Sequence, residues 1–181
     1  KRRCRAALLS EMGLRTSPDR PLVGVVSRFT EQKGLDLLRP VLPEVEAVAD
    51  LAVLGSGDAR LEAAFRAEAG PHVGVRIGFD ESLAHRIEAG ADLFLMPSRF
   101  EPCGLNQMIS MRYATLPVVR RTGGLADSVV DAHADPERGW GFVFERPTPV
   151  ALWGALFRGL KAVRDGRAPL LARRAMDVDV S

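Results

Sequence analysis

Apolar and polar residues follow one another along this chain in a regular order: a short apolar run, a polar loop and a segment with helical spacing. Apolar runs without alternating polar positions are typical of strands that are buried on both faces of a parallel sheet. Six such strands are predicted, at residues 22–26, 51–54, 73–77, 91–96, 116–119 and 141–144. Helices are predicted at residues 59–69, 81–88, 105–113, 125–132, 149–163 and 170–176, and another beginning near Gly34.

This alternation decides the predicted fold class. Strands and helices that alternate six times without a long interruption predict an α/β fold, with a Rossmann-like parallel sheet of about six strands flanked by helices. A chain of 181 residues with 46% hydrophobic residues is large enough to bury the core of one such domain. The charged residues at its start and its abrupt end suggest a piece of a larger protein.

Charge and cysteine content exclude several classes. A formal net charge of +2 is too small to indicate a nucleic-acid partner. No apolar run approaches the ~20 residues that cross a bilayer, and no signal peptide follows the basic start, so no membrane partner is predicted. The two cysteines, Cys4 and Cys103, have no metal-ligand spacing, so no metal site is expected. Two thiols in a chain of this length indicate a reducing compartment.

Two loops that follow predicted strands carry the candidate chemistry. Arg28 and Lys33 lie on the loop after the first strand, and Glu101 lies in the turn between the fourth strand and the helix at 105–113. Loops after parallel strands meet at the carboxyl edge of the sheet, where ligands bind. Basic side chains and the first amides of a helix both favour phosphate groups. The sequence therefore predicts an acid beside a phosphate-binding site.

Other residues after strands have two readings each. Phe79, after the third strand, could stack on a nucleobase or belong to the core. Gly55 and Gly57 are interpreted as a tight turn that allows a ligand to approach the backbone, because the third glycine of a dinucleotide fingerprint is missing. A lone histidine on an amphipathic helix, His85, is more often a surface or packing residue than a catalyst. Two arginines and two glycines after the fifth strand suggest exposed amides near an anion.

Three motifs carry a resemblance to a known family. They are Val26-Ser27-Arg28-Phe29-Thr30-Glu31-Gln32-Lys33-Gly34-Leu35-Asp36, Ser98-Arg99-Phe100-Glu101-Pro102-Cys103-Gly104-Leu105 and Arg121-Thr122-Gly123-Gly124-Leu125-Ala126-Asp127. In this order they resemble the glycogen/starch synthase family of ADP-glucose type. The resemblance implies that the chain is the C-terminal half of a GT-B glycosyltransferase, which moves glucose from ADP-glucose to the non-reducing end of an α-1,4-glucan with retention of configuration.

The resemblance also implies roles for individual residues. Arg28 and Lys33 match the family's cations on the donor diphosphate, and Glu101 matches the active-site glutamate near the transferred glucose. Phe79 lies where family members place an aromatic residue, often tyrosine, against the adenine. Six further residues complete the nucleotide-sugar site that the resemblance implies: Cys103, Gly104, Leu105, Thr122, Gly123 and Gly124. ADP-glucose is implied as a substrate, and neither a cofactor nor a metal ion is expected.

One departure from the wider group of retaining transferases narrows the resemblance. Relatives in that group carry a second glutamate eight positions after the first, where this chain has Ile109. Glycogen and starch synthases also tend to lack it. Two alternatives stay open: another retaining GT-B glycosyltransferase with a different donor or acceptor, and a nucleotide-binding module without catalysis.

The expected domain organisation divides the chain into three segments. Residues 1–20 are expected to form a linker or entry helix, or else an ordinary surface helix. Residues 21–165 would form the nucleotide-sugar-binding domain, and a C-terminal helix at 166–181 would lead back toward a missing N-terminal domain. That missing domain would supply most of the contacts to the glucan, so the chain alone is expected to be inactive. A glycogen synthase would be cytoplasmic in a bacterium, whereas a starch synthase could be plastidic.

Overall fold

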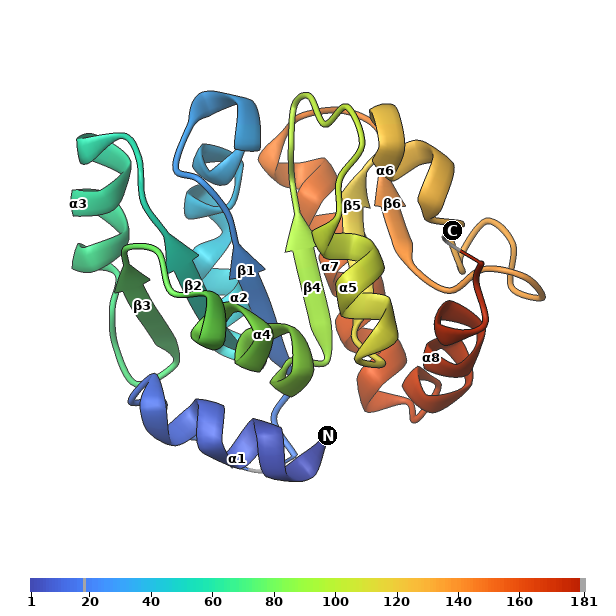
Figure 1. The fold of residues 1–181 in the computed structure, drawn as a ribbon, viewed down its shortest axis with the longest axis horizontal. Helices are drawn as coiled ribbons and strands as arrows, with labels where there is room; N and C mark the ends of the chain where they lie inside the picture. Colours follow the sequence, from blue (N-terminus) through green and yellow to red (C-terminus); the bar gives the residue numbers. More distant parts are fainter. Residues whose placement is uncertain (18, 180–181) are drawn as a thin grey trace.

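The computed structural model describes residues 1–17 and 19–179. Within the predicted segments 1–20 and 166–181, Pro18, Val180 and Ser181 lie outside the described residues. Figure 1 shows a central sheet with helices on both of its faces. Among the described residues, no helix combines the length and the apolar composition that crossing a membrane requires.

The sheet has six strands in the order β3-β2-β1-β4-β5-β6, and every neighbouring pair is parallel. The strands are β1 (Leu22–Val26), β2 (Asp50–Gly55), β3 (Val73–Ile77), β4 (Leu93–Met96), β5 (Leu116–Arg120) and β6 (Phe142–Phe144). This is the order of a doubly wound Rossmann-like sheet, in which the order of the parallel strands reverses between β1 and β4. The predicted fold class is confirmed.

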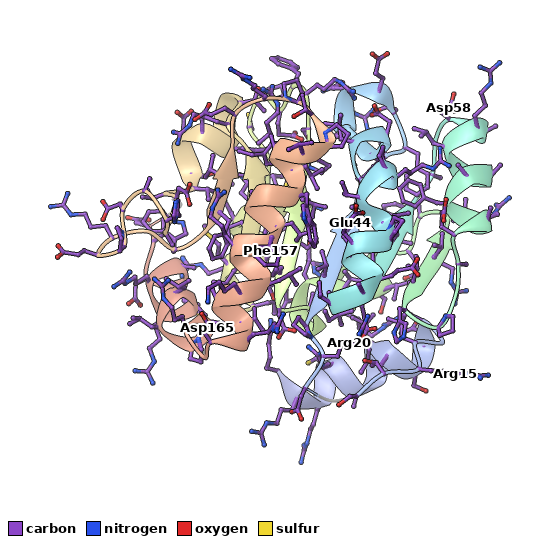
Figure 2. All side chains as sticks on the ribbon, turned by 180° about the vertical axis from the view of Figure 1, so that it is seen from behind. Arg15, Arg20, Glu44, Asp58, Phe157 and Asp165 are labelled. Atoms are coloured by element: carbon purple, nitrogen blue, oxygen red, sulfur yellow. The ribbon has the colours of Figure 1, made fainter. Side chains whose placement is uncertain are left out.

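Helices cover both faces of the sheet. They are α1 (Arg2–Glu11), α2 (Leu42–Val48), α3 (Ala59–Ala67), α4 (Glu81–Gly90), α5 (Asn106–Arg112), α6 (Gly123–Ser128), α7 (Pro149–Arg164) and α8 (Ala168–Met176). α4 and α5 lie in front of the strands in Figure 1, and α2 and α7 lie on the opposite face, toward the viewer in Figure 2. α1 packs against α4, and α8 packs against α5 and β5.

Two apolar clusters, one on each face, hold these layers together. Val23 and Val25 of β1 belong to the cluster that includes Leu156 of α7, whereas Leu22 belongs to the cluster that includes Ile87 of α4. All five side chains are fully buried. Successive strand residues point to opposite faces, so a strand covered on both sides must be apolar at every position. This requirement explains the continuous apolar runs in the sequence.

The helix predicted to begin near Gly34 is wrong. Three short 3₁₀ helices occupy the region instead, η1 (Glu31–Lys33), η2 (Leu35–Leu37) and η3 (Arg39–Val41), and α2 begins only at Leu42. Gly34 has a left-handed φ of 68°, which separates η1 from η2. Pro40 and Pro43 lack the amide hydrogens that a continuous helix would use.

Two helices in the second half of the chain have bounds that differ from the predicted ones. The helix predicted at 125–132 is α6, which ends at Ser128 because Val129 is extended with φ of −132°. The helix predicted at 170–176 begins at Ala168, because a proline such as Pro169 is tolerated in the first turn. The helix expected within residues 1–20 is shorter than that segment, since α1 ends at Glu11. The bounds of the remaining predicted strands and helices lie within two residues of the observed ones.

Candidate functional site

A cavity of about 270 Å³ lies at the carboxyl edge of the sheet. Its walls come from the ends of β1, β2 and β4, from the loop after β3, and from the starts of α4 and α5. The strand order reverses between β1 and β4, and doubly wound sheets bind their ligands at such a reversal. Six of the ten predicted site residues line this cavity: Arg28, Lys33, Phe79, Glu101, Gly104 and Leu105.

Lys33 and Glu101 form an ion pair in the cavity wall. Lys33 Nζ lies 2.5 Å from Glu101 Oε2, and the Ser98 hydroxyl donates a second hydrogen bond of 3.0 Å to the same oxygen. Glu101 is 7% exposed and Ser98 is 2% exposed. A carboxylate this deeply buried requires such partners. One oxygen of Glu101 is thus occupied by donors from η1 and from the loop after β4.

The loop that carries Arg28 is anchored by its neighbour Phe29. Phe29 is fully buried against Phe65, with ring centroids 5.3 Å apart. Its backbone N–H donates to Ser56 O and its carbonyl accepts from Asp58 N, at 2.8 and 2.7 Å. These bonds join the loops after β1 and β2. They leave the exposed Arg28 side chain at the cavity.

Phe79 lies at the wall of the cavity with 90% of its surface exposed. This exposure excludes the alternative that Phe79 belongs to the core. The next residue, Asp80, caps α4 by accepting a hydrogen bond of 2.8 Å from Leu83 N, which fixes the loop that presents the aromatic ring. A flat apolar face at the cavity mouth is suited to stacking on a planar ring.

The residues just before α5 occupy different places. Gly104 and Leu105 line the cavity, whereas Cys103 is exposed and is not part of its lining. Gln107, which is fully buried, donates its side-chain amide to the carbonyl oxygens of Cys103 and Gly104, at 3.3 and 3.0 Å. This amide holds the turn between β4 and α5 in place.

Thr122, Gly123 and Gly124 do not line the cavity. The Gly124 N–H donates to the carbonyl oxygens of Glu101 and Pro102, both at 3.1 Å, so the expectation that this amide is free for an anion is wrong. A Cβ on Gly123 would come within 2.1 Å of Glu101 O, and one on Gly124 within 1.8 Å of Cys103 O. The glycines therefore let α6 support the turn that carries Glu101.

Several residues of the site were not expected from the sequence. Ser98, Asp80 and Ala84 line the cavity, and Ser98 also binds Glu101. The position of Ser98 three residues before Glu101 was the only signal for its role. His85 lies outside the cavity lining, 3.1 Å from the Glu88 carboxylate, in agreement with a packing role.

The loops around the cavity also carry a charged pair. Arg99 forms a bidentate ion pair with Asp36, at 2.6 and 2.7 Å. Its hydrogen bonds lower the pKa of Asp36 and raise that of Arg99. In the part of the chain that the structure describes, no group of three or more His, Cys, Asp or Glu side chains is arranged to hold a metal ion.

A Rossmann-like sheet with cations, a buried acid and an exposed aromatic residue around a cavity at its carboxyl edge is typical of α/β domains that bind small ligands at this edge. The family model described as "Glycosyl transferases group 1" matches residues 20–161. The chain belongs to this family.

Curated relatives and a solved structure support the assignment. The chain is 56% identical over 172 residues to a glycogen synthase of Anaeromyxobacter dehalogenans, and this alignment covers 93% of the chain and 36% of the relative. It is 60% identical over 162 residues to a glycogen synthase of Dechloromonas aromatica, and this alignment covers 84% of the chain and 33% of the relative. The chain therefore spans about a third of the length of these relatives. The resemblance to glycogen and starch synthases is confirmed.

The fold also matches a solved catalytic domain. The starch synthase IV catalytic domain of Arabidopsis thaliana, bound to ADP and acarbose, superposes with a TM-score of 0.91 at 35% sequence identity. The match covers 99% of this chain and 39% of that domain. The six-stranded sheet and its helices are therefore a part of a GT-B catalytic fold.

Proposed function

We propose that this chain is the donor-binding part of a retaining glucosyltransferase that moves glucose from ADP-glucose to the non-reducing end of an α-1,4-glucan. One observation carries the proposal: Arg28, Lys33, Phe79 and Glu101 converge on one cavity at the carboxyl edge of the sheet. The high identity to glycogen synthases supports the same reading. The chain spans about a third of those relatives, so the activity belongs to a longer protein.

The proposed binding mode places each part of the donor against a different wall. The adenine stacks on Phe79, which presents an exposed ring. The diphosphate lies against Arg28 and Lys33, because charge-assisted hydrogen bonds to phosphate are the strong ones. The glucose then lies near Glu101, the buried carboxylate of the cavity. Gly104 and Leu105 complete the wall beside the phosphates and the sugar.

The proposed chemistry follows from these charges. The bond between the anomeric carbon and the diphosphate oxygen breaks, and its electron pair goes to ADP. Arg28 and Lys33 stabilise the negative charge that develops there, while Glu101 stabilises positive charge on the sugar. The acceptor hydroxyl oxygen forms the new bond to the anomeric carbon, and its proton passes to the departing diphosphate oxygen of ADP. Cations of the chain neutralise the leaving group, so the proposal includes no cofactor and no metal ion.

Ile109 favours this proposal over a generic retaining transferase. It occupies the position where that wider group carries a second glutamate, and it lies half-buried on α5, outside the cavity lining. Glu101 is then the carboxylate that we assign to the sugar. Cys103 and the segment Thr122 to Gly124 take the role of supporting the Glu101 turn from outside the cavity.

Domain organisation, partners and location follow as proposals. We propose that residues 1–20 form an entry segment, that residues 21–165 form the nucleotide-sugar-binding domain and that residues 166–181 lead toward the rest of the protein. The glucan contacts mainly a domain outside this chain. The two glycogen synthases named above come from bacteria, which favours the bacterial cytoplasm over a plastid.

The decisive experiment is a transfer assay of the full-length protein. Radiolabelled ADP-glucose and UDP-glucose are each supplied with glycogen or malto-oligosaccharides. We expect incorporation from ADP-glucose with the label at non-reducing ends, where an exo-acting glucosidase releases it first. Equal rates from UDP-glucose would refute the donor assignment, and no incorporation from either would refute the function. The chain alone should bind ADP weakly and transfer no glucose.

A further inference from the structure

Arg99 lies two residues before Glu101, but its side chain reaches the other loop of the site. Nη1 and Nη2 donate to the two carboxylate oxygens of Asp36, at 2.6 and 2.7 Å, and Nη1 also donates to Glu31 O at 2.9 Å. Arg99 is not part of the cavity lining. It therefore spans from the loop after β4 to the η1–η2 segment without facing the ligand site.

Backbone contacts fix the same two segments in register. The Arg99 N–H donates to Gln32 O at 2.8 Å, and Gln32 Nε2 donates to Phe100 O at 3.1 Å. At Gly34 the segments come so close that a Cβ would lie 2.1 Å from Pro97 O. Lys33, between Gln32 and Gly34, is thereby carried to Glu101. The meeting of acid and ammonium follows from the register of residues 31–36 against residues 97–101.

A separate set of contacts attaches the loop after β4 to the sheet. Arg120, at the end of β5, donates from Nε to Ser98 O at 2.9 Å and from Nη2 to Arg99 O. One arginine thus fixes this loop to the sheet, and a second arginine, Arg99, fixes the η1–η2 segment to the loop. The second link adds to the backbone contacts that bring Lys33 to Glu101.

We propose that Arg99 is a positioning residue, whose bidentate hold on Asp36 keeps residues 31–36 in register so that Lys33 and Glu101 face each other across the donor site. A planar guanidinium is suited to this task because it fixes both distance and orientation. The hydrogen bonds from Arg99 lower the pKa of Asp36, so the ion pair persists to a lower pH than a free aspartate would allow. Partly exposed ion pairs add little to stability, so the effect falls on geometry.

The test compares Arg99→Ala with a matched control in the full-length protein. Arg86→Ala removes another bidentate arginine pair, with Glu11 at 2.6 and 2.7 Å, that joins α1 to α4 outside the site. We expect both variants to lose similar amounts of Tm. Only Arg99→Ala should lower kcat, by about ten- to hundred-fold for a displaced catalytic group, with a smaller rise in the Kd for ADP.

A double-mutant cycle separates positioning from general loosening. Once Arg99 is replaced, Lys33→Ala should cost much less than it does in the wild type, whereas Phe79→Ala should cost the same in both backgrounds. Arg99→Lys should restore only part of kcat, since an ammonium cannot bind Asp36 in a fork. If Arg99→Ala does not fold, Asp36→Asn replaces it in the same cycle, because the amide keeps the shape and removes the charge.

The outcomes also distinguish this inference from the proposed function on which it rests. Turnover near that of the wild type in Arg99→Ala, together with a large loss in Lys33→Ala, would overturn the positioning role alone. Additive effects of Arg99→Ala and Lys33→Ala would overturn it as well. A wild-type protein that transfers no glucose overturns the proposed function, and ADP binding then serves as the readout. In that case Arg99→Ala must still weaken ADP binding more than Arg86→Ala does.

Discussion

Lys33 Nζ and Glu101 Oε2 lie 2.5 Å apart, although the two residues are 68 positions apart in the chain. Their side chains are 16% and 9% exposed, so solvent screens the pair only in part. A donor diphosphate that binds Lys33 must share this ammonium with the carboxylate or displace it. The group proposed for the phosphates and the group proposed for the sugar are thus coupled before either touches a ligand.

The coupling leads to a prediction for Glu101. In the full-length protein, Glu101→Ala should lower kcat by about two to three orders of magnitude, which is typical of losing a preorganised electrostatic group. The Kd for ADP should stay the same or fall, because Lys33 loses its competing partner. Glu145→Ala removes an exposed carboxylate bound to Arg121 and is the control. A loss of ADP affinity equal to the loss of kcat would contradict the separation of roles.

The two cations should affect binding and turnover together. Arg28→Ala and Lys33→Ala should each weaken ADP binding and kcat/KM about ten- to hundred-fold, the range for charge-assisted hydrogen bonds. Titration calorimetry and initial rates measure the two quantities. Lys161→Ala, which breaks an exposed pair with Asp165 on α7, should change neither. Near wild-type behaviour of both site variants would exclude the phosphate role.

Phe79 should contribute to nucleotide affinity and not to folding. Its ring is 90% exposed, so Phe79→Ala should leave Tm unchanged. Loss of a base–aromatic stack should weaken ADP binding by about 1–3 kcal/mol, whereas Phe79→Tyr should retain it. Phe157→Ala, on the outer face of α7 (Figure 2), removes another part-exposed ring and should leave ADP binding intact. Unaltered ADP affinity in Phe79→Ala would rule out stacking.

The strands and much of the site could be predicted because each follows from a local rule. A strand covered on both faces must be apolar throughout, so six apolar runs predict the six strands that the sheet contains. Loops after parallel strands share one edge, which brings Arg28, Phe79 and Glu101 to one cavity. These conclusions require no knowledge of which side chains touch.

The remaining features depend on contacts between distant residues. The pair of Arg99 and Asp36 spans 63 positions, and no local pattern indicates it. The sequence suggests an exposed backbone amide at Gly124, but this amide donates to the carbonyl oxygens of Glu101 and Pro102. The region after Gly34 reads as a helix from its apolar spacing, yet a left-handed glycine and two prolines break it into 3₁₀ turns.

Gly124 should tolerate no side chain. A Cβ there would lie 1.8 Å from Cys103 O, a backbone atom that moves only with the turn that carries Glu101. We expect Gly124→Ala to lower kcat more than ten-fold, in line with the cost of misplacing a catalytic group by about 1 Å. The control is Gly154→Ala on α7, where the nearest atom is the Arg158 side chain at 3.9 Å. That change should raise stability by about 0.5–1 kcal/mol, because alanine favours a helix.

Glu88 should make stability depend on pH. It is 2% exposed, and burial raises its pKa above 4.5, although His85, 3.1 Å away, acts in the opposite direction. The folded chain therefore binds this proton more tightly than the unfolded chain does. The stabilisation is fully present below pH 4.5 and is lost as the pH rises through the folded-state pKa.

Glu88→Gln removes this ionisation and keeps the shape of the side chain. The free energy of unfolding of the variant minus that of the wild type should therefore be larger at pH 7 than at pH 4.5, because only the wild type loses stability as Glu88 ionises. Urea denaturation between these pH values, followed by tryptophan fluorescence, measures the difference. Glu145→Gln, at an exposed carboxylate, should show no such trend. Parallel stability profiles for Glu88→Gln and the wild type would mean that the buried carboxylate pays no desolvation cost, because Glu88 would then ionise equally well in the folded and unfolded chains.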